Sequence, residues 1–241
     1  MDDAAPAKEP KHDTYWLLET AGNCFLWLMG GLAIAGDHRV PKTGAVLYVS
    51  NHASFLDPVA IGVASPRRVV FMAKAELFKH RILAWLLDGV DTFPVRRGEP
   101  DRAAFKTTLD MLADGRAVCI FPEGTRSPDG NLMAAEQGAA VFALKTGCPV
   151  VPVYVDGSHR VWGAGKGLRR GRIAVHYGDP FTLDKGMDRE AAGARLMEAI
   201  AAVRDARERD PLRAVPPHRF RKPVEGHRFK PVAKSTVRPK S

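Results

Sequence analysis

Short apolar runs alternate with helical stretches along most of this chain, and this order limits the folds that it can adopt. The apolar runs predict strands at 45–50, 68–72, 90–95, 117–121, 149–155 and 172–177, and the stretches between them predict helices at 55–64, 75–88, 101–114, 135–146 and 188–208. Strands joined through helices predict an α/β domain with a largely parallel central sheet flanked by helices. In such sheets, ligands bind beyond the carboxyl ends of the strands.

Length and charge divide the chain into four parts. Its 241 residues and 45% hydrophobic content suit one folded domain, which we place at 36–210, after a flexible N-terminus at 1–13 and an apolar helix at 14–35. The formal charge of +9 is concentrated in residues 211–241, which contain nine Lys or Arg residues, six prolines and one acidic residue. That composition predicts a disordered basic tail, because it contains few large apolar side chains to bury.

The apolar stretch at 14–35 raises the question of membrane association. Glu19 and Asn23 interrupt it, and only 24–35 is continuously apolar, whereas a spanning helix needs ~20 such residues. We therefore expect a helix lying in the membrane interface, with Trp16 and Trp27 at the level of the lipid headgroups. Two alternatives are a buried core helix and a secretory signal ending at Ala35, although a signal should begin with positive rather than acidic residues.

The cysteines and potential metal ligands exclude several classes of site. Cys24, Cys119 and Cys148 are odd in number and widely spaced, which argues against a disulfide framework or a zinc site and suits a reducing cytoplasm. Cys119 lies within an apolar run, so a small core residue is a better interpretation than a nucleophile. With no ligand-spaced cluster and no G-x-S-x-G element, we expect neither a metal nor a serine nucleophile.

Two polar loops follow predicted strands and carry the residues suited to chemistry. The run VSNHASFLDP at 49–58 contains His52 and Asp57, and a carboxylate close to an imidazole can fix its tautomer and stabilise its charged form. An alternative is that Ser54 and Asp57 form a capping box at the start of a helix. The run AVCIFPEGTRS at 117–127 places Arg126 beside a glycine-containing turn.

These two blocks, in this order, resemble the motifs of the glycerolipid acyltransferase family, and those of bacterial 1-acylglycerol-3-phosphate acyltransferases in particular. FPVRRG at 93–98 resembles the second block of the family and VPV at 151–153 resembles the fourth, so that the resemblance covers roughly residues 40–180. It implies that 36–210 is the acyltransferase domain, that His52 is the catalytic base, and that Asp57 orients and stabilises the base.

The resemblance also implies where substrates bind. Lys74, Arg96, Arg97, Gly124, Thr125 and Arg126 would bind the phosphate of the acceptor, with Glu123 contacting acceptor hydroxyls or steadying its loop. A solvated surface charge is the alternative for each arginine. Val151, Pro152 and Val153 would form an apolar wall for the acyl chain, or simply an ordinary strand. The helix at 75–88 is too apolar for a solvated helix, and it could line an acyl groove, contact lipid or pack in the core.

One difference between this sequence and the family pattern bears on the identity of the acceptor. Family members often carry a basic residue at the position where this chain has Glu136, so that a less anionic acceptor such as a lyso-aminolipid is an alternative. The implied reaction transfers a fatty acyl group from acyl-CoA or acyl-carrier protein to lysophosphatidic acid, which gives phosphatidic acid for phospholipid biosynthesis. No cofactor is expected, and the enzyme would lie on the cytoplasmic face of the cell membrane as a peripheral or monotopic protein in contact with membrane lipids.

Three other functions remain open at this point. Glycerol 3-phosphate would be a different acceptor on the same fold, and water as the acceptor would make the protein a thioesterase. A basic lipid-binding or nucleic-acid-binding protein is suggested by the tail at 211–241. Nucleic acid is not the expected partner, because the body is nearly neutral and the tail has few interleaved aromatic residues.

Overall fold

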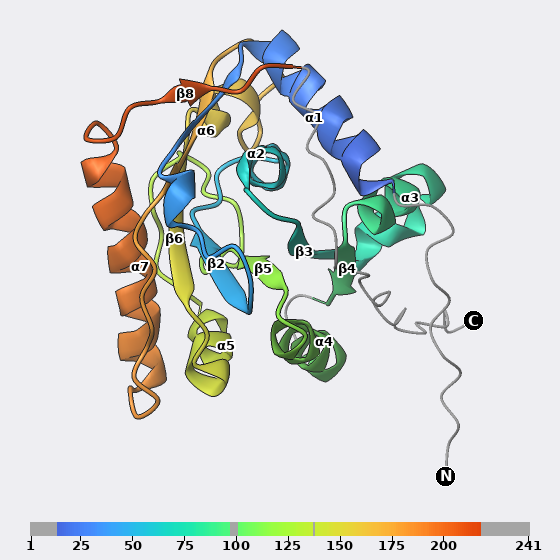
Figure 1. Cartoon of the computed structure of the whole chain (residues 1–241). Helices are drawn as coiled ribbons and strands as arrows, with labels where there is room; N and C mark the ends of the chain where they lie inside the picture. Colours follow the sequence, from blue (N-terminus) through green and yellow to red (C-terminus); the bar gives the residue numbers. More distant parts are fainter. Residues whose placement is uncertain (1–13, 97–100, 137, 218–241) are drawn as a thin grey trace.

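The computed structural model describes residues 14–96, 101–136 and 138–217, and it has one sheet between two layers of helices (Figure 1). The strands are β1 (Leu32–Ala35), β2 (Val46–Ser50), β3 (Val69–Lys74), β4 (Thr92–Val95), β5 (Ala117–Ile120), β6 (Val150–Asp156), β7 (Ile173–Tyr177) and β8 (Arg213–Ala214). Their order across the sheet is β4-β3-β5-β2-β6-β7-β1-β8. The predicted α/β class is therefore confirmed.

The helices are α1 (Tyr15–Met29), α2 (Asp57–Ala64), α3 (Arg81–Gly89), α4 (Arg102–Ala113), α5 (Ala139–Thr146), α6 (Ser158–Trp162) and α7 (Arg189–Ala206), with 3-10 turns η1 (Asp37–Arg39) and η2 (Ala75–Lys79). α1 and α2 cover one face of the sheet, and α4, α5 and α7 cover the other (Figure 1). The side chains of successive β2 residues therefore point to opposite faces of the sheet. Tyr48 packs in the core on the α2 face, and Leu47 packs in the core on the α7 face. The sequence of a strand that is covered on both faces is a nearly continuous apolar run, and the sequences of these strands follow that pattern.

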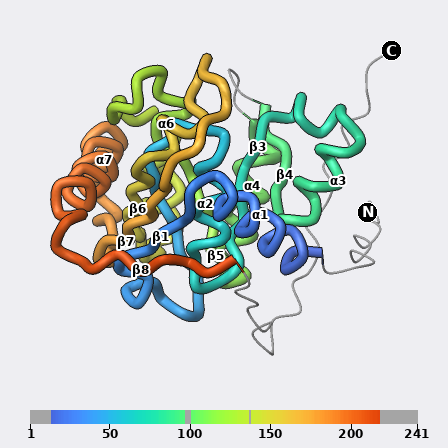
Figure 2. Tube along the Cα trace, turned by 90° about the horizontal axis from the view of Figure 1, so that it is seen from above, coloured from blue at the N-terminus to red at the C-terminus, as the bar shows by residue number. Residues whose placement is uncertain are grey.

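The expectation of a largely parallel sheet was wrong, because the sheet is mixed. β6 and β7 are antiparallel: the connection at 157–172 stays at the edge where β6 ends, and β7 runs back from that edge. β8 also pairs antiparallel, with β1, at the end of the sheet, where the two segments lie side by side (Figure 2). An antiparallel return needs no helix crossing the sheet, so the alternation of strands and helices could not indicate it.

The helix expected over 14–35 ends at Met29, and the following residues join the sheet. Gly30 and Gly31 have positive φ values of 134° and 99°. Glycine adopts such values without the steric strain that other residues would suffer, and this change of backbone conformation ends α1. β1 then lies fully buried beside β7. Among the described residues, no helix is long and apolar enough to cross a bilayer.

The beginning of the predicted disordered tail is ordered. Within 211–217, Val215 is buried and donates its backbone N–H to the carbonyl of Leu32. The buried amide of Asn23 donates to the carbonyl oxygen of Pro216 at 2.7 Å, which fastens this segment across α1. The predictions for 1–13 and 218–241 fall outside the described residues.

Asn51 connects the strands β2 and β6 at the start of the loop that contains His52. Its side chain donates Nδ2–H to the carbonyl of Val155 at 3.1 Å and accepts the N–H of Val155 at 2.8 Å. Both groups are buried, so water cannot replace either bond. Asn51 therefore fixes the end of β2 against β6, immediately before His52.

We expect Asn51→Ala to lower the free energy of unfolding by about 2–4 kcal/mol, because two buried backbone groups of Val155 would lose their partners. Urea denaturation would measure the loss. Asn131→Ala is the matched control, since Asn131 makes only exposed hydrogen bonds to Asp129, and it should change the free energy by less than about 0.5 kcal/mol. An Asn51→Ala variant as stable as the wild type would contradict this role.

Candidate active site

The two polar loops meet because β2 and β5 are parallel neighbours whose carboxyl ends lie at the same edge of the sheet. The loop after β2 carries His52, and the loop after β5 carries Glu123 and Arg126. The backbone N–H of Ser127 donates to the carbonyl of His52 at 2.7 Å, which joins the loops directly. The structure thus brings the two blocks identified in the sequence into one site.

His52 and Asp57 form a buried hydrogen-bonded pair. Nδ1 of His52 lies 2.9 Å from Oδ2 of Asp57, whose side chain is fully buried. The same oxygen accepts the backbone N–H groups of Ala53 and Ser54, each at 2.7 Å. Because a carboxylate only accepts, Nδ1 of the ring carries the hydrogen and Nε2 is left as a proton acceptor.

The capping alternative is met only in part. Asp57 accepts the N–H of Ser54, but Ser54 Oγ accepts the N–H of Leu56 at 3.0 Å rather than that of Asp57, and Leu56, the N-cap of α2, makes no side-chain capping bond. α2 starts at Asp57 itself. One carboxylate therefore stabilises the turn and orients the imidazole at the same time.

Glu123 and Phe121 hold His52 from the second loop. The ring of Phe121 stacks on the imidazole, with centroids 4.1 Å apart and an interplanar angle of 21°. Oε1 of Glu123 accepts the backbone N–H of His52 at 3.2 Å. Burial raises the pKa of Glu123 to about 7, and its Oε2 has no hydrogen-bond partner among the described residues. This carboxyl group therefore ties the loop after β5 to the backbone of His52.

Arg126 supplies the fixed positive charge of the site. Its guanidinium lies 3.6 Å from the centroid of the Phe55 ring, and its Nη1 is buried without a hydrogen-bond partner among the described residues. Gly124 has φ 66°, and a Cβ at this position would overlap the carboxylate of Glu136, so a larger residue would strain the backbone and displace that side chain. Thr125 is exposed beside them.

The other expected cationic residues lie at the same edge but are less tightly held. Lys74 ends β3 and is exposed. Arg96 follows β4, lines a cavity, and donates its backbone N–H to Asp101 at 2.9 Å. Arg97 lies outside the described residues. Of this group, the structure places only Arg126 directly in the loop that contacts His52.

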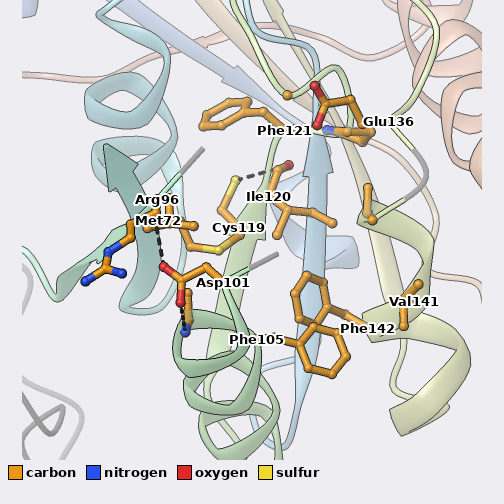
Figure 3. Close-up of a pocket in the computed structure, with 16 residues that line it drawn as sticks. Met72, Arg96, Asp101, Phe105, Cys119, Ile120, Phe121, Glu136, Val141 and Phe142 are labelled. Carbon is orange, nitrogen blue, oxygen red and sulfur yellow. Dashed lines mark hydrogen bonds between the residues drawn. The ribbon is translucent and has the colours of Figure 1, made fainter. Parts of the chain in front are cut away.

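A mostly apolar cavity of about 350 Å³ lies beside the loop after β5, and Figure 3 shows the side chains that line it. Its walls come from β3, β4, β5, α4 and α5, and they include Met72, Phe105, Ile120 and Phe142. Phe121 lines the cavity and also stacks on His52, so its ring lies between the cavity and the imidazole. Arg96, Asp101 and Glu136 line the cavity as well, but most of its wall is apolar.

Val151, Pro152 and Val153 do not line this cavity. They lie in β6, where Val151 and Val153 are fully buried in the core below α2. Their position favours the ordinary-strand alternative over an acyl groove. The segment at 75–88 forms η2 and α3, in which no residue is buried, so core packing does not describe it.

Three further residues of the site were not predicted: Asn51, Phe55 and Phe121. Asn51 and Phe55 lie inside the run at 49–58 and Phe121 lies inside the run at 117–127, so adjacency to the motifs was the available signal. In 14–96, 101–136 and 138–217, no group of three or more His, Cys, Asp or Glu residues is arranged to hold a metal.

The raised pKa of Glu123 predicts a pH-dependent stability. Its folded-state pKa of about 7 exceeds the ordinary 4.5, so wild-type stability falls as pH rises between these values. Glu123→Gln removes the buried charge, and we expect its stability relative to the wild type to be about 2 kcal/mol greater at pH 8 than at pH 5. Urea denaturation at both pH values would measure this. The same comparison with the exposed Glu76→Gln should show no such difference.

Comparison with known proteins agrees with this geometry. The chain is 29% identical over 169 residues to the 1-acyl-sn-glycerol-3-phosphate acyltransferase of Bacillus subtilis (strain 168), covering 69% of this chain and 82% of that protein. It is 34% identical over 150 residues to the chloroplastic enzyme BAT2 of Brassica napus, covering 59% of this chain and 43%, less than half, of that relative.

A solved structure shares the fold. The crystal structure of the 1-acyl-sn-glycerophosphate (LPA) acyltransferase PlsC from Thermotoga maritima superposes with a TM-score of 0.66 at 26% identity, covering 78% of each chain. The acyltransferase family model matches residues 31–156, more than half of the chain and all of the site from His52 to Arg126. The resemblance noted in the sequence is confirmed, and the chain belongs to the acyltransferase family.

Proposed function

We propose that this protein transfers a fatty acyl group from a thioester donor, acyl-CoA or acyl-carrier protein, to the free hydroxyl of 1-acylglycerol 3-phosphate. The observation that carries the proposal is the 2.9 Å contact between His52 and the buried Asp57, next to the loop that presents Arg126. The names of the relatives and of the superposed structure support the same acceptor.

The geometry suits direct transfer without an acyl-enzyme. Nε2 of His52 takes the proton of the acceptor hydroxyl while its oxygen attacks the thioester carbonyl, and Asp57 stabilises the imidazolium that forms. When the tetrahedral intermediate collapses, the carbon–sulfur bond breaks and the proton passes from His52 to the leaving thiolate. The phosphate of the acceptor binds Arg126, and the acyl chain enters the apolar cavity beyond Phe121.

A second acceptor class is favoured by Glu136. Glu136 lines the cavity next to the loop of Gly124, at the position where members of the family often carry a basic residue. A cationic amine on the acceptor would be attracted to the carboxylate of Glu136. A lyso-aminolipid is therefore the alternative acceptor to compare with lysophosphatidate.

The test is an acyl-transfer assay with purified full-length protein, labelled acyl-CoA or acyl-carrier protein, and a panel of acceptors analysed by mass spectrometry. The panel contains lysophosphatidate, glycerol 3-phosphate, a lyso-aminolipid and no acceptor. Phosphatidic acid as the main product supports the proposal. Release of free fatty acid at the same rate without an acceptor would show a thioesterase instead.

In this assay we expect His52→Ala to lower kcat by about 10²–10⁴ with no change in circular dichroism, because the base is lost. Asp57→Asn should also lower kcat by orders of magnitude, since an amide cannot stabilise the imidazolium. Asn caps a helix nearly as well as Asp does, so an active Asp57→Asn variant would mean that Asp57 serves only the turn. His38→Ala, which changes an exposed histidine outside the site, is the control and should retain wild-type kcat.

The outer face of α1 is the proposed contact with the membrane. Leu17, Ala21, Cys24 and Leu28 recur at helical spacing on its exposed side, and Trp27 is exposed next to them. This stripe contains no charged residue, which suits the interfacial helix expected from the sequence and a peripheral or monotopic enzyme on the cytoplasmic face. The Lys and Arg residues of 211–241 would add a salt-dependent attraction to anionic lipid.

We expect the double variant Leu17→Gln, Leu28→Gln to bind phospholipid vesicles roughly 10- to 100-fold more weakly, because two leucines lose their burial in lipid. Co-sedimentation with vesicles in high salt would isolate this apolar contribution. The matched control is Leu168→Gln, which changes an exposed leucine outside α1 and should bind like the wild type. Equal binding by all three proteins would rule out α1 as the contact.

A further inference from the structure

The cationic side chain of the site rests on an aromatic ring that the reaction itself does not use. The guanidinium carbon of Arg126 lies 3.6 Å from the centroid of Phe55, well within the ~6 Å range of an attractive cation–π contact. Phe55 is 49% exposed, although it is a large apolar residue in a loop that is otherwise buried. Core packing therefore does not account for a phenylalanine at this position.

Phe55 is itself held by a rigid support. Its ring lies 5.0 Å from that of Trp162, at an interplanar angle of 42°. Trp162 packs against the core cluster below α2, and its carbonyl accepts the hydroxyl of Ser54 at 2.7 Å. A bridge between Ser54 and Gly163 adds backbone pairing to the same contact. The loop before α2 is thus fastened to the end of α6 at Ser54, the residue that precedes Phe55.

The Phe55 ring covers one face of the Arg126 guanidinium and does not cover the edge of that group. Within the described residues, Arg126 has no carboxylate ion pair, and its buried Nη1 has no hydrogen-bond partner. A free arginine side chain has several rotatable bonds, whose freedom is lost when it binds an anion. A side chain already held flat on an aromatic ring loses less freedom and presents its planar fork to phosphate oxygens.

We propose that Phe55, supported by Trp162, is a positioning residue that pre-orients Arg126 for the phosphate of the acceptor. This inference rests on the proposed function for the identity of that phosphate. The ring touches neither the scissile thioester nor the attacking hydroxyl, so its effect is on acceptor binding and not on proton transfer at His52. Any phosphate monoester that reaches Arg126 should show the same dependence on Phe55.

The first arm of the test is steady-state kinetics with lysophosphatidate. Phe55→Leu keeps an apolar side chain but removes the π face, and it should raise the acceptor KM about 3- to 30-fold while kcat and the donor KM stay within about 2-fold. Phe55→Tyr keeps the ring and should restore the acceptor KM. Trp162→Leu should raise the acceptor KM in the same direction. A Phe55→Leu enzyme with a wild-type acceptor KM, or with only the donor KM altered, would overturn the proposal.

A double-mutant cycle with Arg126→Ala separates positioning from direct contact with lipid. Once Arg126 is removed, Phe55→Leu should change the acceptor KM by less than about 2-fold, because the ring would have nothing left to orient. Equal effects of Phe55→Leu with and without Arg126 would mean that the ring contacts the substrate itself. Phe181→Leu is the matched control, since Phe181 carries a similar contact with Arg195 outside the site and should leave the kinetics unchanged.

The second arm does not depend on the acceptor. Inorganic phosphate is titrated into the full-length protein while the side-chain N–H signal of Arg126 is followed by nuclear magnetic resonance. We expect the Kd for phosphate to rise about 3- to 30-fold in Phe55→Leu and to return in Phe55→Tyr. If the wild type fails to acylate lysophosphatidate but shows this pattern, only the proposed acceptor is wrong. If phosphate does not perturb Arg126, or binds equally to all variants, the positioning role is wrong.

Discussion

The site depends on one carboxylate that serves two purposes. Oδ2 of Asp57 accepts two loop amides and the imidazole of His52, so the turn that ends β2, the start of α2 and the orientation of the base share a single acceptor. Asn51 fixes the beginning of this loop to β6, and Glu123 fixes its middle to the loop after β5. Because these contacts hold His52, its position needs to change little during the proposed reaction. Groups that are fixed in this way beforehand stabilise a transition state well.

The sequence indicated the polar residues of the candidate site better than their surroundings. His52, Asp57 and Arg126 could be selected because their residue types and spacing suit a chemical role in any fold, and the structure brings their two loops together. Phe55 and Phe121 were not selected, because an aromatic residue next to a motif has no pattern that separates a support for a ring or a guanidinium from an ordinary core residue. The cavity was not foreseen either, because its walls come from α4, α5 and three strands, and only the packing of these elements brings Phe105 and Phe142 together.

The errors in the fold share a physical cause, which is that local patterns carry no information on partners far along the chain. The six strands identified from apolar runs form the continuous part of the sheet from β4 to β7, whereas β1 was assigned to an apolar helix and β8 to a polar tail. Leu32–Ala35 is a strand because Gly30 and Gly31 end α1 and because β7 provides backbone partners. Arg213–Ala214 is ordered because β1 and Asn23 hold the segment, and no feature of its own composition predicts that.

The place of β1 in the sheet has a consequence for how the chain folds. β1 is synthesised well before both of its neighbours in the sheet, β7 and β8. Until they emerge from the ribosome, β1 has an open hydrogen-bonding edge and an apolar helix beside it, a combination that favours association with other chains. Closing this edge requires contacts between distant parts of the sequence, which form slowly. β1 should therefore stay unpaired for longer than a strand whose partners lie close to it in the sequence.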